Sequence, residues 1–301
     1  MYLQHFGLAE APFSLTPNTE FFFGLAPHVE ALQVLQTALQ TGEGFIKVTG
    51  EVGTGKTLIC RKLLNDIPQR FHCAYLPNPY LKPDELRWAL AAELGLKYSP
   101  QIDQQQLTSL IQQQLVALSA HGHSIVLVLD EAQALPDESL EALRLFTNLE
   151  TESRKLLQVV LFAQPELDER LQLKQFRQLR QRITFSYRLR PLTRQETTAY
   201  LSHRLQIAGG QGKALFSISD SQRIAKAARG IPRLINVLAH KALLVAFGEG
   251  RQQVCRGHIN AAIADTEDAT PVTMKRWWLA ALTSVAVLSA MVWHWFVGAL
   301  I

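Results

Sequence analysis

A glycine-rich string of eight residues begins at Gly50 and fits the spacing G-x-x-x-x-G-K-[ST] at every position. Glycines let backbone N–H groups converge on phosphate oxygens without interference from Cβ atoms, and a helix that follows adds its dipole. Lys56 would place a point charge on the β- and γ-phosphates, and Thr57 would ligate Mg²⁺. The alternative is a glycine-rich turn that binds no ligand. A strand is expected before the string and a helix after it, which is the context that the motif requires. We predict a nucleoside triphosphate site formed by Gly50, Glu51, Val52, Gly53, Thr54, Gly55, Lys56, Thr57 and Leu58.

Two acids, Asp130 and Glu131, end an uninterrupted apolar run that starts at Ile125. Such a run is typical of a strand in a parallel sheet that is covered on both faces. Asp130 would orient Mg²⁺ through water, and Glu131 would polarise the attacking water as general base. The alternative is a pair of acids that cap a helix. Together with the glycine-rich string, the acids favour hydrolysis of ATP with Mg²⁺ as cofactor.

Two amides follow other predicted strands. Gln164 comes just after the strand expected at 158–162, where its side chain could touch the γ-phosphate or the water, or could be a turn residue. Asn78 follows the strand expected at 73–76 and could hold Glu131 in an inactive pose.

Arginines are frequent in the second half of the chain. Arg182 is our candidate for a finger supplied to the γ-phosphate of a neighbouring subunit. Arg233, at the start of a predicted helix, could reach back to the phosphates and couple helix position to nucleotide state, or it could only pack that helix start. A nucleic-acid patch and a solvated basic face are the other interpretations of the run Arg177, Arg180, Arg182, Arg188, Arg190 and Arg194.

Strands alternate with helices up to Pro191, which predicts an α/β fold with a doubly wound parallel sheet. Beyond it, helical patterns predominate, with a capping box at Thr193 and Glu196, a cap at Ser219 and a proline at a helix start. The strands are expected at 45–49, 73–76, 125–130, 158–162 and 183–187, and the later helices at 194–208, 220–228, 232–247 and 256–264. We therefore predict an ATPase core over 1–190, a small helical lid domain over 191–265 and a linker over 266–276.

The composition bounds the class of protein. The chain has 301 residues, of which 48% are hydrophobic and 19% charged, which is typical of an ordered globular protein. A formal net charge of +4 is too small to indicate nucleic-acid binding by itself. Three cysteines without a C-x-x-C pair indicate a reduced compartment rather than a disulfide framework.

The segment from Trp277 to Ile301 contains no Asp, Glu, Lys or Arg. About 25 helical residues rise roughly 38 Å, against a hydrocarbon core of about 30 Å. Tryptophans near both ends suit two aromatic belts, and Lys275 and Arg276 precede the span. We predict one transmembrane helix over 277–301 with the preceding domains in the cytoplasm; a buried globular helix is the alternative. The N-terminus shows no signal peptide.

With these motifs in this order, the chain resembles the AAA+ ATPases, and more closely the family of general secretion pathway protein A (ExeA) and the MSHA pilus biogenesis protein MshM. The resemblance covers roughly residues 1–265. The most family-specific parts are the string that opens at Met1 and the string Gln164-Pro165-Glu166-Leu167; other matching parts are Pro12-Phe13-Ser14, Leu129-Asp130-Glu131-Ala132-Gln133, Gln181-Arg182-Ile183 and Gly230-Ile231-Pro232-Arg233.

The resemblance implies further roles. Pro12, Phe13 and His28 would lie near the adenine, Gln164 would be sensor 1 and Arg233 sensor 2. It also implies a homo-oligomer, a ring among the possibilities, anchored in the bacterial inner membrane, with pilus or secretion machinery proteins as partners. Because the chain ends near the predicted membrane helix, without a periplasmic peptidoglycan-binding region, the MshM-like interpretation is preferred.

Three functions are weighed. The favoured one is a membrane-anchored ATPase that couples ATP binding and hydrolysis to assembly of a type IV (MSHA-like) pilus or a secretion apparatus. The alternative is an ATPase that handles nucleic acid, of the transposition or origin-binding type, against which the membrane helix and the charge argue. A third is a scaffold that binds ATP without hydrolysing it, against which Glu131 argues.

Overall fold

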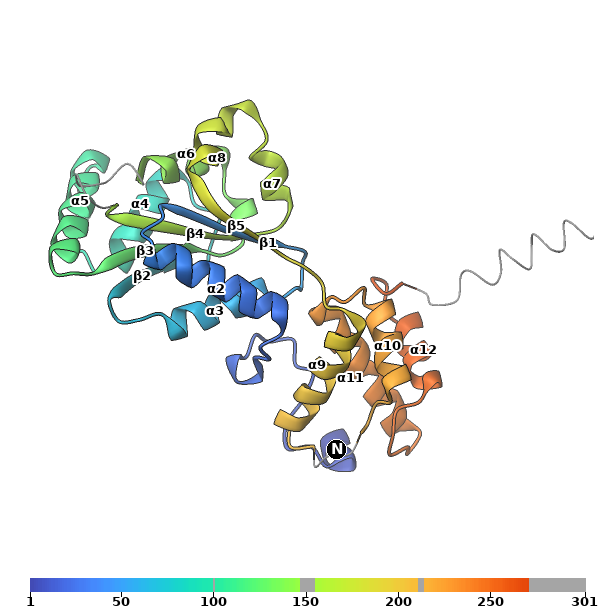
Figure 1. The fold of residues 1–301 in the computed structure, drawn as a ribbon. Coiled ribbons are helices and arrows are strands. Elements are labelled where there is room, and N and C mark those ends of the chain that lie inside the picture. Colours follow the sequence, from blue (N-terminus) through green and yellow to red (C-terminus); the bar gives the residue numbers. More distant parts are fainter. Residues whose placement is uncertain (100, 147–154, 211–213, 271–301) are drawn as a thin grey trace, which may run out of the picture.

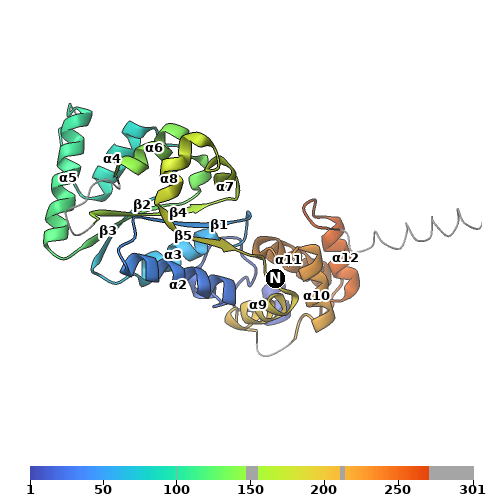
Figure 2. The ribbon, with the colours of Figure 1, turned by 45° about the horizontal axis from the view of Figure 1, so that its top comes forward.

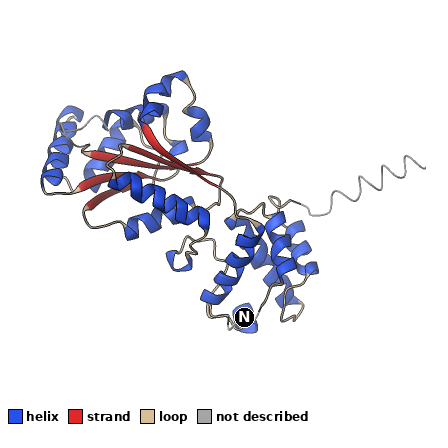
Figure 3. Cartoon of the chain, viewed as in Figure 1, coloured by secondary structure: helices blue, strands red, loops and turns tan. Residues whose placement is uncertain are grey.

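The computed structural model describes residues 1–99, 101–146, 155–210 and 214–270. Figures 1 and 3 show a sheet flanked by helices and, beside it, a bundle of helices that contains no strand in the part described. The chain passes between these two units just after the last strand, so the long axis of the molecule runs from the sheet to the bundle (Figure 1).

The sheet contains β1–β5 in the order β2-β3-β4-β1-β5, and every recorded pairing is parallel. The predicted α/β parallel sheet is thereby confirmed. The parallel arrangement brings the carboxyl ends of β1, β3 and β4 to one edge, where ligands of open α/β sheets bind. The strand bounds are β1 Phe45–Gly50, β2 Phe71–Leu76, β3 Ser124–Leu129, β4 Leu157–Ala163 and β5 Ile183–Leu189.

Both faces of the sheet are buried, because side chains alternate between them along each strand. Val126 and Val128 pack with Ile59 on one side, while Leu127 and Leu129 pack with Ile111 on the other. Helices α2 and α3 cover the first face, and α4, α5, α6 and α8 the second (Figure 2). Their bounds are α2 Ala26–Gln40, α3 Lys56–Asp66, α4 Pro83–Glu93, α5 Gln104–Ala120, α6 Asp137–Phe146 and α8 Arg177–Arg182.

The helical unit has a hydrophobic core of its own, and α1 (Tyr2–Phe6) packs into it. Phe6, Phe13 and Phe21 belong to this core together with Leu201 and Leu238. Apolar residues up to Leu25, within the range predicted as the ATPase core over 1–190, thus pack into the core of the helical unit. The other helices are α9 Arg194–Ile207, α10 Ile218–Ala227, α11 Pro232–Gly248 and α12 Arg256–Ala264.

Local signals located most helix starts. The capping box of α9 is present, with Glu196 N donating to Thr193 Oγ1 at 3.2 Å. The cap of α10 is Ser217 rather than Ser219, because the Asp220 side chain completes a capping box with Ser217. Short helices at loop positions escaped prediction: α6, α7 (Glu166–Arg170), α8, η1 (Thr19–Phe21), η2 (Ala132–Ala134) and η3 (Lys174–Phe176).

The end of the described chain also differs from expectation. Within the predicted linker 266–276, of which 266–270 are described, Ala269 is buried in the helical core and Thr270 N donates to Ala227 O at 3.0 Å. In the portion of the chain that is described, no helix has the length and apolar character needed to span a membrane. The predicted span 277–301 lies outside that portion.

Candidate nucleotide site

The glycine-rich loop, residues 50–57, joins β1 to α3 at the carboxyl edge of the sheet. Gly53 and Gly55 have φ angles of 80° and 104°, a left-handed region that glycine adopts without strain. The buried Thr54 closes the loop, with Oγ1 donating to Glu51 O at 2.8 Å. The loop is thus closed on itself directly before the start of α3, the place where a helix N-terminus favours phosphate.

Lys56 is only 4% exposed, and its Nζ donates to Gly50 O at 2.8 Å and to Glu51 O at 3.1 Å. Burial lowers the pKa of Lys56, and the negative charges of Glu131 and Asp130 oppose that change. The cation is thus held against the loop by its own carbonyl groups, with acids on the adjacent strand end.

Asp130 follows β3 and is buried, and its Oδ1 accepts a hydrogen bond from Glu131 N at 2.9 Å. Burial raises the pKa of Asp130, while a hydrogen bond with the Thr57 side chain lowers it. A hydroxyl and a carboxylate side by side are hard oxygen ligands that fit Mg²⁺. No cluster of three His, Cys, Asp or Glu that could hold a metal occurs among the described residues.

Glu131 has a φ of 52°, in the left-handed region where a side chain is strained by roughly 1–3 kcal/mol. Two amides hold its carboxylate: Gln133 Nε2 donates to Oε2 at 2.7 Å, and Gln164 Nε2 donates to the same oxygen at 3.0 Å. Burial opposes ionisation of Glu131, but these hydrogen bonds outweigh it and lower its pKa. The carboxylate is therefore ionised, as a general base must be.

The predicted hold of Asn78 on Glu131 is wrong. The exposed Asn78 accepts a hydrogen bond from Tyr80 N at 3.1 Å, within its own loop, and the amide bonds recorded for Glu131 come from Gln133 and Gln164.

A cavity of about 350 Å³ lies between the loop and the helical unit. Gly53 and Arg233 link its two sides, because Arg233 N donates to Gly53 O at 3.1 Å. The exposed side chain of Arg233 lines the opening. The cavity is lined by Ser14, Leu15, Thr16, Pro17, Asn18, Val52, Gly53, Gly55, Lys56, Thr57, Leu58, Glu131, Tyr200, Arg204, Pro232, Arg233 and Asn236.

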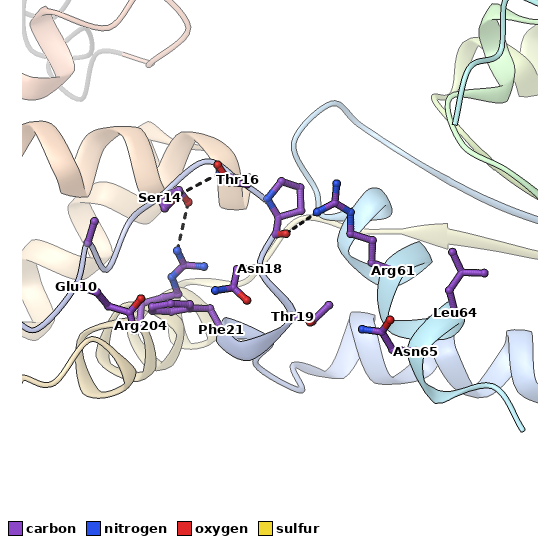
Figure 4. Close-up of a pocket in the computed structure, with 12 residues that line it drawn as sticks. Glu10, Ser14, Thr16, Asn18, Thr19, Phe21, Arg61, Leu64, Asn65 and Arg204 are labelled. Carbon is purple, nitrogen blue, oxygen red and sulfur yellow. Dashed lines mark hydrogen bonds between the residues drawn. The ribbon is translucent and has the colours of Figure 1, made fainter. Parts of the chain in front are cut away.

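A second cavity of about 590 Å³ shares Ser14, Thr16, Pro17, Asn18 and Arg204 with the first (Figure 4). Arg61, on α3, reaches across to donate to Pro17 O at 2.8 Å. Arg204, on α9, donates to Ser14 O at 3.3 Å and to Pro12 O, and its guanidinium lies 4.4 Å from the centre of the Phe21 ring. The segment 14–18 is thus tied to both units and forms a wall of both cavities.

The residues expected near the adenine lie one layer behind these walls. Pro12 supplies its carbonyl group to Arg204, and Phe13 is buried edge-on to Phe216 in the helical core. His28, also buried, bonds through Nε2 to Thr54 O at 3.1 Å and so supports the glycine-rich loop from below. None of the three lines either cavity.

Arg182 lies at the other edge of the sheet. It precedes β5, whose first residue pairs with Phe45 at the start of β1, whereas the glycine-rich loop follows the end of β1. Six residues of strand separate the two edges by about 16 Å. Arg182 is therefore not part of the site in its own chain.

Several residues of the site escaped prediction, above all Tyr200, Arg204 and Asn236, which line the cavity, and Gln133, which donates to Glu131. Tyr200 and Arg204 stand one helical turn apart on α9, and Tyr200 Oη donates to Asn236 Oδ1 at 3.0 Å. Arg204 is only 5% exposed, and arginines are rarely buried to this extent. The signal that could have found it is the spacing of its neighbours along α9, which places it on the buried face of the helix.

Comparisons with known proteins identify a family model and a relative that this chain matches. Residues 39–171 match the family model of the AAA domain. Over 262 residues the chain is 44% identical to general secretion pathway protein A of Aeromonas hydrophila, an alignment that covers 87% of this chain and 48% of that protein. The chain thus spans about half the length of this curated relative.

Solved structures share the fold at low identity. The Aeropyrum pernix ORC2 protein in its ADPNP–ADP complexes has a TM-score of 0.61 at 16% identity, covering 84% of this chain and 72% of that one. Cdc6p of Pyrobaculum aerophilum has a TM-score of 0.61 at 19% identity, covering 82% and 70%. The chain carries an AAA domain and belongs with general secretion pathway protein A in one family.

Proposed function

We propose that the protein hydrolyses ATP and uses the reaction to drive assembly of a secretion apparatus or a type IV (MSHA-like) pilus at the bacterial inner membrane. One observation carries the hydrolytic part: Lys56, Thr57 and Glu131 line one cavity, with an ionised carboxylate beside a buried cation, and Asp130 is hydrogen-bonded to Thr57 and to Glu131 N. A site that only binds nucleotide has no need of Glu131.

Each residue has a role that its position supports. Lys56 would leave the carbonyl groups of its own loop to bind the β- and γ-phosphates. Thr57 and Asp130 would hold Mg²⁺, which when bound neutralises charge that develops on the phosphates. Glu131 would accept a proton from the attacking water, and Gln164, which already touches Glu131, would act as sensor 1.

The helical unit would act as a lid. Its α11 begins against the glycine-rich loop through Arg233 N and Gly53 O, and Arg233 would bind phosphate as sensor 2. Movement of α11 would then follow the state of the nucleotide, as in other lids that close over a substrate.

A homo-oligomer would complete the site. Arg182 lies at the edge of the sheet opposite its own loop, so the finger role predicted for it requires a neighbouring subunit. Mutant R182A should bind ATP and fail to hydrolyse it, and equal mixing with chains that carry Glu131→Gln should restore part of the activity if the finger acts between subunits.

The assembly role rests on the family and on the predicted membrane helix 277–301, with the domains before it in the cytoplasm. The test is a pull-down from detergent-solubilised membranes with Glu131→Gln, which would trap ATP, and Lys56→Ala, which would not bind it. Capture of pilus or secretion platform proteins by the trapped form alone would support the role. Normal surface pili and normal secretion in cells that contain only Lys56→Ala would refute it.

A nucleic-acid role is the second candidate, because the fold is shared with the Aeropyrum pernix ORC1 protein, whose structure was solved in complex with DNA. It predicts DNA affinity that falls steeply with salt. Titration of the purified chain with duplex DNA at two salt concentrations distinguishes the candidates, and absence of binding removes this one.

A further inference from the structure

The side chain of Gln133 has no role assigned by the sequence motifs or by the comparisons, although the residue belongs to the string Leu129-Asp130-Glu131-Ala132-Gln133. It comes two residues after Glu131, at the C-terminal side of β3, and is half-buried. Its two polar atoms both find partners: Nε2 donates to Glu131 Oε2 at 2.7 Å, and Oε1 accepts from Gln164 N at 2.9 Å. One amide thus ties the end of β3 to the end of β4.

The backbone of Gln133 is held as well. Its carbonyl oxygen accepts a hydrogen bond from Arg170 Nη1 at 2.6 Å, and the same guanidinium donates to Leu135 O at 2.9 Å. Arg170 ends α7, which packs through Leu167 into the core of the sheet. Gln133 is therefore held at its backbone, and both polar atoms of its side chain have hydrogen-bond partners. Such support is the condition for precise placement of a functional group.

The geometry explains how Glu131 keeps an unfavourable backbone conformation. The φ of 52° aims the carboxylate along the cavity edge, and the two amide donors converge on Oε2 alone. Among the described residues no hydrogen bond to Oε1 is recorded, so this second oxygen is the one that can accept a hydrogen bond from water. When hydrogen bonds hold one oxygen of a carboxylate, the direction of its other oxygen is fixed as well.

We propose that Gln133 is a positioning residue for ATP hydrolysis: by bridging Glu131 and the backbone of Gln164, it aims the free oxygen of the base at the attacking water. The inference rests on the proposed hydrolysis and goes beyond it, because it assigns a function to a residue that touches neither phosphate nor metal ligand through its recorded bonds. It also makes the base and Gln164 one unit rather than two independent groups.

The test compares Q133A and Q133E with Q175A in the full chain. Q133E keeps the size and an acceptor for Gln164 N, and in its ionised form it cannot donate to Glu131. Gln175 is the matched control, because it too donates to a carboxylate, that of Asp137 at 2.8 Å, outside the cavity. We expect Q133A and Q133E to lower kcat by about tenfold with KM for Mg·ATP changed less than about twofold, and Q175A to behave as wild type.

A double mutant separates positioning from a structural role. If Gln133 acts through Glu131, its loss should matter little once the base is gone, so E131Q and E131Q/Q133A should have equal single-turnover rates. A further loss of the full tenfold in the double mutant, a wild-type kcat in Q133A and Q133E, or a raised kcat would each overturn the proposal. If Q133A fails to fold, Q133E and its double mutant with E131Q decide the question.

The outcome is distinguishable from failure of the proposed function. A wild-type chain that binds ATP without turnover refutes hydrolysis itself. Turnover by wild type that is unchanged in Q133A and Q133E refutes only the positioning role.

Discussion

The nucleotide cavity has two walls of different construction. The sheet wall consists of short loops at the ends of β1, β3 and β4, and its charged groups Lys56, Asp130 and Glu131 are held by neighbours within a few residues or on the next strand. The helical wall consists of long side chains on α9 and α11 and of a segment from the N-terminus, joined by contacts such as that from Arg204 to Pro12, 192 positions apart.

This difference suggests a division of work. Groups fixed by a parallel sheet stay within tenths of an ångström of their places, which suits proton transfer and metal binding. Groups on helices and on a terminal segment can move together, which suits closure over the ligand. We expect changes in the sheet wall to lower kcat and changes in the helical wall to raise KM.

The largest effect is expected at Glu131. E131Q keeps the shape and the hydrogen bonds with the amides but removes the base, so kcat should fall by about 10²–10⁴-fold while ATP binding persists. Phosphate release and equilibrium binding of labelled ATP measure the two quantities. If E131Q loses binding as well, the sheet wall does not separate chemistry from affinity, and the comparison fails at its first step.

The contact between the walls can be broken at Gly53. A Cβ there would lie 2.6 Å from Arg233 Cβ, a close contact that forces the loop and α11 apart. Gly42 is the matched control, because its φ of 78° is nearly the same as the 80° of Gly53 and a Cβ there would meet nothing within 4 Å. G42A should lower the free energy of unfolding by about 1 kcal/mol, the cost of a left-handed alanine.

G53A should cost about 2–3 kcal/mol more than that, shared between stability and ATP affinity. Urea denaturation and ATP titration of both variants provide the comparison. Equal losses in G53A and G42A would mean that α11 yields freely and that the walls are not in firm contact.

Arg204 tests the helical wall alone. It is buried and donates to the carbonyl groups of Pro12 and Ser14, so R204M leaves these acceptors without their donor at a cost of about 2 kcal/mol. The segment 14–18 should loosen, KM for ATP should rise about tenfold and kcat should stay within about twofold. R194M, a change at an exposed arginine of the same helix, is the control and should alter neither constant. A fall in kcat at unchanged KM would contradict the division of work.

The two walls also differ in how well the sequence predicts them. The sheet wall follows local rules: an apolar run predicts a strand, a glycine-rich string predicts the loop, and acids after a strand fall at the active edge. Lys56 and Asp130 were located in this way to the residue. Their roles in catalysis stay predictions until activity is measured.

The helical wall depends on contacts that no local pattern contains. Phe13 and Phe21 are apolar residues in a segment without periodicity, and only the folded chain shows that they belong to the core of α9 and α11. The same holds for Arg204, whose partners lie near the other end of the sequence. Gln133 is a third case, because its neighbours Glu131 and Gln164 come together only when β3 and β4 pair. The place of His28 near the adenine comes from the resemblance alone and stays a prediction.

The smallest effect concerns the junction between the units, where Arg190 donates to Glu196 through both guanidinium nitrogens, at 2.8 and 2.9 Å. These bonds, together with the cap at Thr193, lower the pKa of Glu196 to about 2, although burial opposes them. Because the folded-state pKa lies below the unfolded one, the pair stabilises the fold above about pH 4.5 and loses this contribution as the pH falls toward 2. Arg190 is 44% exposed, so solvent screening limits the contribution to about 1 kcal/mol.

E196Q, which keeps the cap acceptor, should therefore be less stable than wild type by about that amount at pH 7 and equal to it near pH 2. Urea denaturation across this range measures the difference, and a gap that persists unchanged at low pH would place the effect in the cap rather than in the ion pair.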